Sequence, residues 1–246
     1  MTGRDIAGDV ASLFVTHTTL PAIVEAGLEG RQGSIARDGD AARLTLGCYE
    51  VFGGAASGQG ARRLIAGAKR PELVYGNDPA WRAVILDVRG ELAERSMTEF
   101  VASGLDAVAL ARVAASVVPG FTVRRIDLVL AEQLDGELEP HGLQVFPTAR
   151  DLVDYGLGFG AVSADGLLVC AATSYTLSSR YLEVAIATRT AFRGRGLAMV
   201  VSAALIGETL ARNLIPCWSA SNPISRRLAE RLGYRPAGEC EVLLLR

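Results

Sequence analysis

The sequence has little of the side-chain chemistry that metal centres and charge-relay triads require. It contains only two histidines, His17 and His141, so a histidine-rich metal site or a Ser-His-Asp triad has almost nothing to draw on. The four cysteines lie far apart without a C-x-x-C pair, which argues against a zinc cluster or a redox motif; they are Cys48, Cys170, Cys217 and Cys240. We therefore predict no metal site, and reduced, buried thiols of the kind found in cytosolic proteins.

A strong charge of one sign and a long apolar run are also missing. The 25 basic and 27 acidic residues give a formal charge of -2, so no bulk field attracts nucleic acid or an anionic membrane, and we expect neither as a partner. The first residues, MTGRDIAGDV, lack the apolar core of a signal peptide, and the longest nearly apolar stretch, residues 197–206, is too short to cross a bilayer. These features predict a cytoplasmic protein.

The length and apolar content allow one large domain or two smaller ones. With 246 residues, half of them hydrophobic, the chain can bury a real core in either case. We place a soft boundary where Pro119-Gly120 ends a predicted helix, which gives an accessory region of residues 1–119 and a domain of residues 120–246. In the accessory region the glycine-rich segment 47–62 is the loosest part, and 81–88 is ambiguous. Helices are expected at 5–26, 59–68 and 105–117, and a hairpin at 34–46 around Asp38-Gly39.

The second region has a clearer rhythm. Strands are expected at 121–126, 157–163, 167–175, 181–188, 216–221 and 238–245. Helices are expected at 127–134, 148–155, 194–213 and 223–232. An antiparallel meander followed by a strand-helix-strand-helix-strand run predicts a mixed sheet with helices packed against it.

The stretch AFRGRGLAMVV, residues 191–201, places two glycines and two arginines before an apolar run. It is not a P-loop, because the lysine and hydroxyl of G-x-x-x-x-G-K-[ST] are missing. It is not a dinucleotide fingerprint either, because Met199 stands where G-x-G-x-x-G needs its third glycine. What remains is Arg193-x-x-Gly196-x-Ala198 between a strand and a helix.

The first turn of a helix leaves backbone N–H groups unpaired at the positive end of its dipole, and can therefore bind an anion. Gly194 and Gly196 would let a pyrophosphate approach the backbone, and Ala198 keeps the same face narrow. Arg193 and Arg195 add charge. A basic turn before a buried helix explains the same residues, so this motif alone leaves both interpretations open.

A second block favours the anion site. The R/Q-x-x-G-x-G/A signature of the GCN5-related N-acetyltransferase (GNAT) superfamily matches residues 193–198, and IPCWSASNPISRRLAERLGY, residues 215–234, resembles the end of the same fold. Both blocks stand in the right order at a suitable separation. Among subgroups the sequence looks most like the zwittermicin A resistance acetyltransferases. The resemblance covers the last 90 to 125 residues or so and implies an α/β (α+β) fold, a mixed, mostly antiparallel twisted sheet flanked by helices, with an additional N-terminal α/β region.

The resemblance implies acetyl-CoA as the cofactor and assigns its contacts. Strand alternation puts Leu182, Val184 and Ile186 on one face of the central strand and Glu183, Ala185 and Ala187 on the other. Backbone groups around Ala185, Ile186 and Ala187 would bind the pantetheine arm. The pyrophosphate would lie against Arg193, Gly194, Arg195, Gly196, Leu197 and Ala198. Asn222 and Ser225 would contact the cofactor, although Asn222 before Pro223 is also a good N-cap.

Glu183 is the only carboxylate on this strand and is our candidate general base, directly or through water. The alternative is an ion pair with Arg180 or Arg189. Many relatives carry a proton-donating tyrosine seven residues after the asparagine, where this chain has Ala229, so the usual general acid is missing. Ser219, Ser225, water or direct thiolate release remain open, and Tyr234 is expected to pack.

These inferences point to an acetyl-CoA-dependent N-acetyltransferase that acetylates an amine of a small molecule. A protein or peptide N-acetyltransferase and a non-catalytic acyl-CoA-binding module stay open as alternatives. The accessory region would shape the acceptor pocket or form a subunit contact, which leaves a homodimer open.

Overall fold

The computed structural model describes residues 10–15, 17, 19–134, 136–138 and 145–245, and the chain forms two compact units. The first consists of Met1–Glu99 and Gly238–Arg246, and the second of Phe100–Ala237. The chain thus enters the second unit earlier than the boundary predicted near Gly120. The reason is helix α5 (Ala107–Ala114), which packs on the helix α8 (Leu197–Ala211) and buries Leu110 in the second unit's core.

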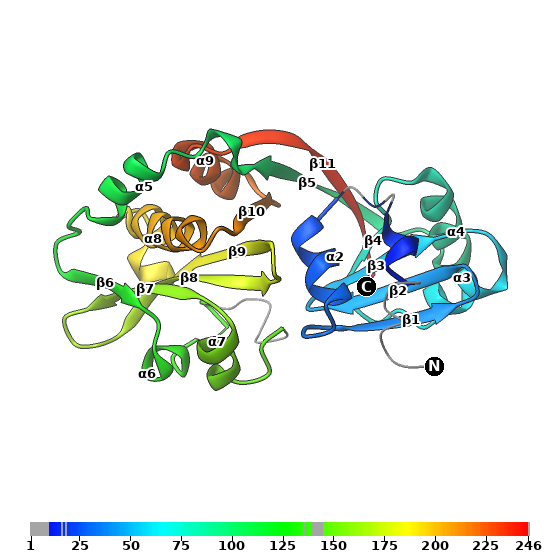
Figure 1. Cartoon of the computed structure of the whole chain (residues 1–246), viewed down its shortest axis with the longest axis horizontal. Helices are drawn as coiled ribbons and strands as arrows, with labels where there is room; N and C mark the ends of the chain where they lie inside the picture. Colours follow the sequence, from blue (N-terminus) through cyan, green and yellow to red (C-terminus); the bar gives the residue numbers. More distant parts are fainter. Residues whose placement is uncertain (1–9, 16, 18, 135, 139–144, 246) are drawn as a thin grey trace. The chain divides into compact units, whose positions relative to one another are not determined.

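The second unit contains the predicted meander. Its strands lie in the order β10-β9-β8-β7-β6, all neighbours antiparallel except the parallel pair β9–β10. Their bounds are β6 (Phe121–Arg125), β7 (Gly158–Ser163), β8 (Leu168–Leu177), β9 (Tyr181–Thr188) and β10 (Ile215–Ala220). In Figure 1, α5 and α8 lie on one face of the sheet, and α6 (Leu128–Ala131) and α7 (Ala149–Tyr155) on the other. The expected mixed, mostly antiparallel sheet flanked by helices is confirmed.

Local signals set the ends of the helices in this unit. Asn222 caps α9 (Pro223–Leu232), whose bounds match the sequence prediction. Thr148 and Asp151 form a reciprocal capping box at α7. Helix α8 begins at Leu197, not at Gly194 as predicted, because Gly194 and Gly196 have φ angles of 77° and 79°, which no α-helix contains.

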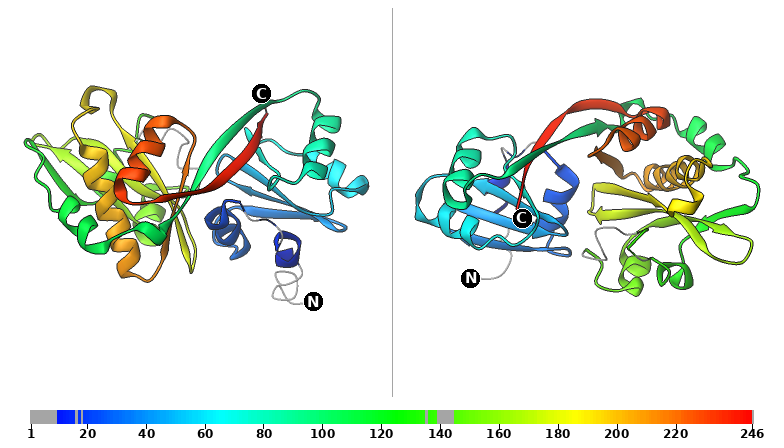
Figure 2. Two further views of the ribbon diagram at one scale, coloured as in Figure 1. Left: turned by 90° about the horizontal axis from the view of Figure 1, so that it is seen from above. Right: turned by 180° about the vertical axis from the view of Figure 1, so that it is seen from behind.

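The first unit has its own sheet and core. Its strands lie in the order β1-β2-β3-β4-β11-β5, and Figure 2 shows the two long strands β5 and β11 running side by side. The bounds are β1 (Ser34–Asp38), β2 (Ala41–Leu46), β3 (Tyr49–Gly54), β4 (Glu72–Val74), β5 (Ala93–Val101) and β11 (Arg235–Leu244). The helices are α2 (Pro21–Leu28), α3 (Gly58–Ala66) and α4 (Pro79–Arg89), and Trp81 of α4 stacks on Phe52 of β3. Strands β4 and β5 have no counterpart in the sequence prediction.

Two predictions for this unit are wrong. The segment 47–62 is not the loosest part, because it contains the buried strand β3. The single helix expected over 5–26 is absent from the described residues of that range. They hold two helical residues, Val10 and Ala11, then a 3-10 turn, Ser12–Phe14, and the larger part of α2; residues 1–9, 16 and 18 lie outside the described residues. Leu20 has a φ of 50° and Pro21 begins α2, so no continuous helix can pass through this point.

Gly54→Ala should lower the free energy of unfolding by more than about 3 kcal/mol. Gly54 has a φ of 78°, and a Cβ there would lie 2.2 Å from the Asp40 carbonyl oxygen, so strain and a backbone clash combine. Gly39→Ala is the matched control: its φ is 62°, but a Cβ would meet nothing within 4 Å, so we expect a loss of only about 1 kcal/mol. Urea denaturation of both variants measures the difference, and equal losses would contradict the clash.

Within the described residues, no helix is both long and apolar enough to cross a membrane.

Candidate functional site

The loop between β9 and α8 presents unpaired backbone N–H groups. A 3-10 turn, Thr190–Phe192, is followed by Gly194 and by Gly196, the N-cap of α8. Among the described residues, the N–H groups of 194–198 have no protein acceptor, because the first bonds of the helix run from Met199 and Val200 to the Gly196 carbonyl. Consecutive free N–H groups at a helix N-terminus form an anion-binding surface.

The two glycines of this loop are required by its backbone angles. Both lie in the left-handed region, and a Cβ at either would meet no protein atom within 4 Å. They therefore leave the outer side of the loop open as well as permitting its turn. Leu197 is buried in the core and Ala198 packs against it, so these core contacts hold the start of the helix in place.

The two arginines of the motif are exposed and anchored close by. Arg193 donates from Nε to the Thr188 carbonyl at 3.1 Å. The Arg195 guanidinium lies 5.3 Å from the Phe192 ring centroid and 5.9 Å from that of Phe121. Both place positive charge beside the free N–H groups.

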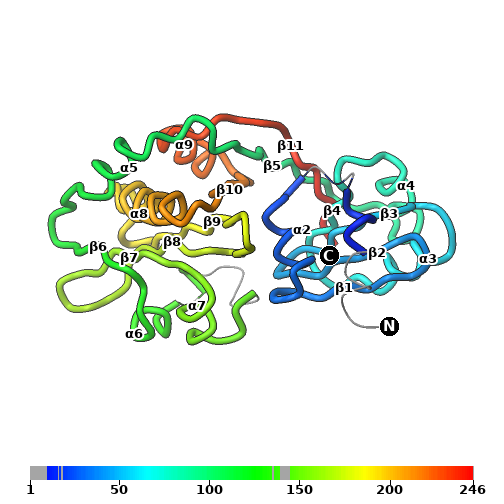
Figure 3. Tube along the Cα trace, in the orientation of Figure 1, coloured from blue at the N-terminus to red at the C-terminus, as the bar shows by residue number. Residues whose placement is uncertain are grey.

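Strands β9 and β10 part after a short paired section. Their register runs from Tyr181↔Ile215 to Glu183↔Cys217 and ends there, although β9 continues to Thr188 and β10 to Ala220. From Val184 onward β9 pairs with β8 alone. Because a strand carries hydrogen-bonding groups along both edges, the edge of β9 toward β10 is left without a strand partner over Ala185, Ile186 and Ala187. Figure 3 shows the Cα traces of β9 and β10.

Glu183 lies at the last paired position of β9 and is only 6% exposed. The register between β8 and β9 shifts between Ser174 and Thr176, directly opposite Val184 and Glu183. Such a bulge re-aims side chains and marks many active sites. The predicted alternation is confirmed, since Leu182 and Val184 lie in the core with Ile186 packed against it.

Asn222 and Ser225 stand at the start of α9. Oδ1 of Asn222 accepts the N–H groups of Ile224 and Ser225 at 3.0 and 2.9 Å, so its N-cap role is confirmed. Its side-chain amide nitrogen has no partner among the described residues. The Ser225 hydroxyl accepts a hydrogen bond from Trp218 Nε1 at 3.0 Å, which ties α9 to β10.

Two residues bear on the missing general acid. Ala229 is fully buried in the core, so α9 offers no side-chain proton donor at that position. Tyr234 packs with its ring centroid 5.7 Å from that of Trp218, as the sequence predicted. Its hydroxyl is buried and has no hydrogen-bond partner among the described residues. Burial, together with the nearby Cys217 and Glu183, raises the pKa of Tyr234 well above its usual value, so the phenol stays neutral.

Tyr234→Phe should raise the free energy of unfolding by about 1 kcal/mol, because the variant no longer buries an unpaired hydroxyl. Urea denaturation of the two proteins measures the change. Destabilisation would show that the hydroxyl has a partner in solution.

Of the two histidines, the structure describes only His17. Nδ1 of His17 lies 3.0 Å from the Thr19 carbonyl in the first unit, and burial lowers the pKa of the ring. His141 lies outside the described residues. Within them, no three His, Cys, Asp or Glu side chains gather in a way that could hold a metal ion.

A comparison with protein families matches residues 12–243 to the model for GNAT acetyltransferases. The chain belongs to the GNAT acetyltransferase family. The match includes most of the first unit as well as the motif at residues 193–198, so it spans nearly the whole chain.

Solved structures agree with this membership. A GCN5-related N-acetyltransferase-like protein from Streptococcus suis 89/1591 is 28% identical with a TM-score of 0.83, and the alignment covers 99% of each chain. A GCN5-related N-acetyltransferase from Kribbella flavida is 15% identical, with a TM-score of 0.62 over 92% of this chain and 96% of that one. A tandem GNAT protein from the clavulanic acid biosynthesis pathway is 14% identical, with a TM-score of 0.63 over 99% and 94%. The last two show the fold alone. No curated protein matches the sequence.

One group of site residues has no signal in the sequence. Arg189, at the end of β9, contacts Gln133 and Glu137, which lie more than fifty positions earlier in the chain. No short motif connects these positions, so only the structure brings them together.

Proposed function

We propose that this GNAT protein is an acetyl-CoA-dependent N-acetyltransferase that acetylates an amine of a small molecule. The observation that carries the proposal is the continuity of two features: an unpaired edge of β9 leads directly to the free N–H groups at the start of α8. A pantetheine arm needs the first feature and a pyrophosphate the second.

The loop supplies the pyrophosphate site in this proposal. The N–H groups of Gly194, Gly196, Leu197 and Ala198 donate to phosphate oxygens, and Arg193 and Arg195 add charge. The open side of both glycines gives the phosphates room to approach the backbone. The backbone of Ala185–Ala187 holds the pantetheine arm, and an N–H there polarises the thioester carbonyl.

The start of α9 follows β10, the strand that stops pairing with β9 after Glu183. The free side-chain amide of Asn222 donates to the cofactor while Oδ1 keeps its capping role. The Ser225 oxygen already accepts a hydrogen bond from Trp218, so its hydroxyl O–H is left to donate a hydrogen bond to the cofactor.

Glu183 is the proposed base. Bound acetyl-CoA would supply the acetyl group as a thioester; an amine nitrogen would attack its carbonyl, so that the C–N bond forms, the C–S bond breaks and the sulfur leaves as thiolate. Glu183 takes the proton from the attacking nitrogen, directly or through water. A thiol pKa of about 8.5 makes the thiolate a tolerable leaving group even without protonation. The absence of a proton donor at position 229 therefore need not prevent the reaction. Holding the two reactants together contributes roughly 7 to 11 kcal/mol in favourable cases.

In this proposal the first unit shapes the acceptor pocket or makes a subunit contact in a homodimer. We place the protein in the cytoplasm, where cysteines such as these four, which form no disulfide in the structure, stay reduced. The two sequence blocks at 182–198 and 218–234 support a place in the zwittermicin A resistance subgroup. The net charge of -2 does not favour a protein substrate over a small amine.

A second candidate is a non-catalytic acyl-CoA-binding module. The buried Ala229 favours it, because α9 lacks the usual acid, while the loop serves binding in either case.

Release of free thiol from acetyl-CoA, measured across a panel of small amines and lysine peptides, tests both candidates. Thiol release with small amines supports the leading proposal, and release only with peptides shifts the substrate class. Tight acetyl-CoA binding without release on any amine supports the binding module. An absence of acetyl-CoA binding contradicts both.

A further inference from the structure

Arg189 is held at the end of β9 by groups from two other segments. Its Nε donates to the Leu168 carbonyl at 2.7 Å, and one terminal nitrogen donates to the Gln133 carbonyl at 3.2 Å. Its side chain is only 14% exposed. An arginine with its donors fixed on carbonyl groups holds a defined position.

Glu137 links the same place to the turn that follows β9. One carboxylate oxygen accepts the Thr190 N–H at 2.9 Å, and the other lies 3.5 Å from the Arg189 guanidinium. The Thr190 N–H and then Arg189 lower the pKa of this carboxyl, so it is ionised at neutral pH. Thr190 is the first residue of the turn that leads to Gly194, so Glu137 fixes where the loop begins.

Gln133 completes the arrangement. Its side-chain oxygen accepts the Leu168 N–H at 2.8 Å, and its side-chain nitrogen donates to the Gly166 carbonyl at 3.3 Å. The segment after α6 is thereby attached to the β7–β8 hairpin. We call Gln133, Glu137 and Arg189 the Arg189 clasp.

The loop itself has few other constraints. Residues 193–196 belong to no strand or helix, and Gly194 and Gly196 lose more backbone entropy on ordering than other residues. Contacts of Phe192 with Phe121 and of Arg193 with the Thr188 carbonyl hold the middle of the loop. The clasp holds its start.

We propose that the Arg189 clasp preorganises the loop at residues 190–198 for the pyrophosphate of acetyl-CoA. The inference rests on the proposed function and names the residues that position its cofactor site. Without the clasp, binding must order the loop as well as contact the phosphates, and the ordering cost appears as lost affinity. Arg189 and Glu137 are positioning residues, since neither needs to touch the cofactor.

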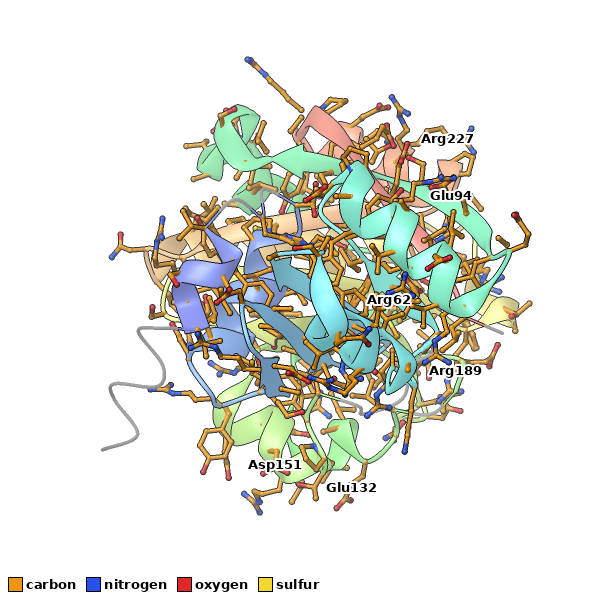
Figure 4. The ribbon with its side chains drawn as sticks, turned by 90° about the vertical axis from the view of Figure 1, so that its right-hand side faces the viewer. Arg62, Glu94, Glu132, Asp151, Arg189 and Arg227 are labelled. Carbon is orange, nitrogen blue, oxygen red and sulfur yellow. The ribbon has the colours of Figure 1, made fainter. Side chains whose placement is uncertain are left out.

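The test compares acetyl-CoA with acetylpantetheine, which has the same thioester and no pyrophosphate. Arg189→Lys and Glu137→Ala should each weaken acetyl-CoA binding, measured by calorimetry, about tenfold, the usual effect of losing a charge-assisted hydrogen bond. For acetylpantetheine, kcat/KM should stay within about twofold, because no phosphate contact is involved. The matched control is Glu132→Ala, an exposed glutamate that Figure 4 shows away from Arg189.

The outcomes separate the clasp from the function. Unchanged acetyl-CoA affinity in both clasp variants overturns the inference, and so does an equal loss with both substrates, which indicates general damage. Glu137 is about half exposed, so its variant should fold even if Arg189→Lys does not. If the wild-type protein itself does not bind acetyl-CoA, the proposed function fails first and the inference fails with it.

Discussion

An aspartate in place of Gly196 should bind acetyl-CoA roughly 100-fold more weakly than an asparagine at the same position. Gly196 has a φ of 79°, and asparagine and aspartate are the residues that best tolerate this region after glycine. Both are also good N-cap residues. The pair therefore changes the charge at the start of α8 while keeping size and conformation almost constant.

The expected loss follows from what lies around Gly196. The N–H groups of 194–198 have no acceptor within the described chain, so the carboxylate of an aspartate can occupy the place proposed for the pyrophosphate. It competes for the same donors and repels the phosphates. The helix itself should not suffer, because a negative charge at its N-terminus is favourable.

Calorimetric titration with CoA and urea denaturation measure binding and stability in the same two proteins. We expect equal or slightly higher stability for the aspartate variant, and weaker binding that recovers in part at high salt. Equal affinity in the two variants would mean that no phosphate lies at this helix start. Gly39→Asn and Gly39→Asp, at an exposed left-handed glycine of the β1–β2 hairpin, serve as the control pair and should bind CoA alike.

The parts of this molecule that the sequence predicts are those with local causes. Asn222-Pro223 carries both the cap and the first residue of α9, so the helix can be placed to the residue. Asp38-Gly39 is also a local signal, and it lies at the turn of the hairpin formed by β1 and β2. The positive φ angles of Gly194 and Gly196 are likewise a property of glycine in its own turn.

The missed parts depend on residues distant in the sequence. Strand β3 ends in Gly53-Gly54, a pair that in the sequence is typical of a loop. In the structure Leu13, Phe14 and Asp40 pack so closely against these glycines that a Cβ would not fit. The end of β9–β10 pairing after Glu183 depends on the course of both strands. The Arg189 clasp joins positions 133, 137 and 189 through backbone carbonyl and N–H groups and one ion pair, which no local side-chain pattern encodes.

Glu183→Gln should lower kcat for acetyl transfer roughly 100- to 10,000-fold while leaving the affinity for acetyl-CoA almost unchanged. Glu183 is nearly buried on β9 and marks the point where β10 stops pairing, which places it beside the proposed thioester position. The amide keeps the volume of the carboxylate and cannot accept the proton that the amine nitrogen must lose. The loss should therefore appear in kcat, because the loop at residues 190–198, the proposed pyrophosphate site, is untouched.

The size of this loss in kcat should depend on the pKa of the acceptor amine. An acceptor of low pKa is already neutral near pH 7 and needs the base only after attack, so part of the activity of Glu183→Gln should return with such amines or at higher pH. A structural role for the glutamate predicts a loss independent of amine pKa and pH, together with lower stability. Full activity in Glu183→Gln with every amine would exclude this residue as the base, and the proton would then have to leave through water. The proposed cofactor site, which depends on the backbone of β9 and α8, would be unaffected by that result.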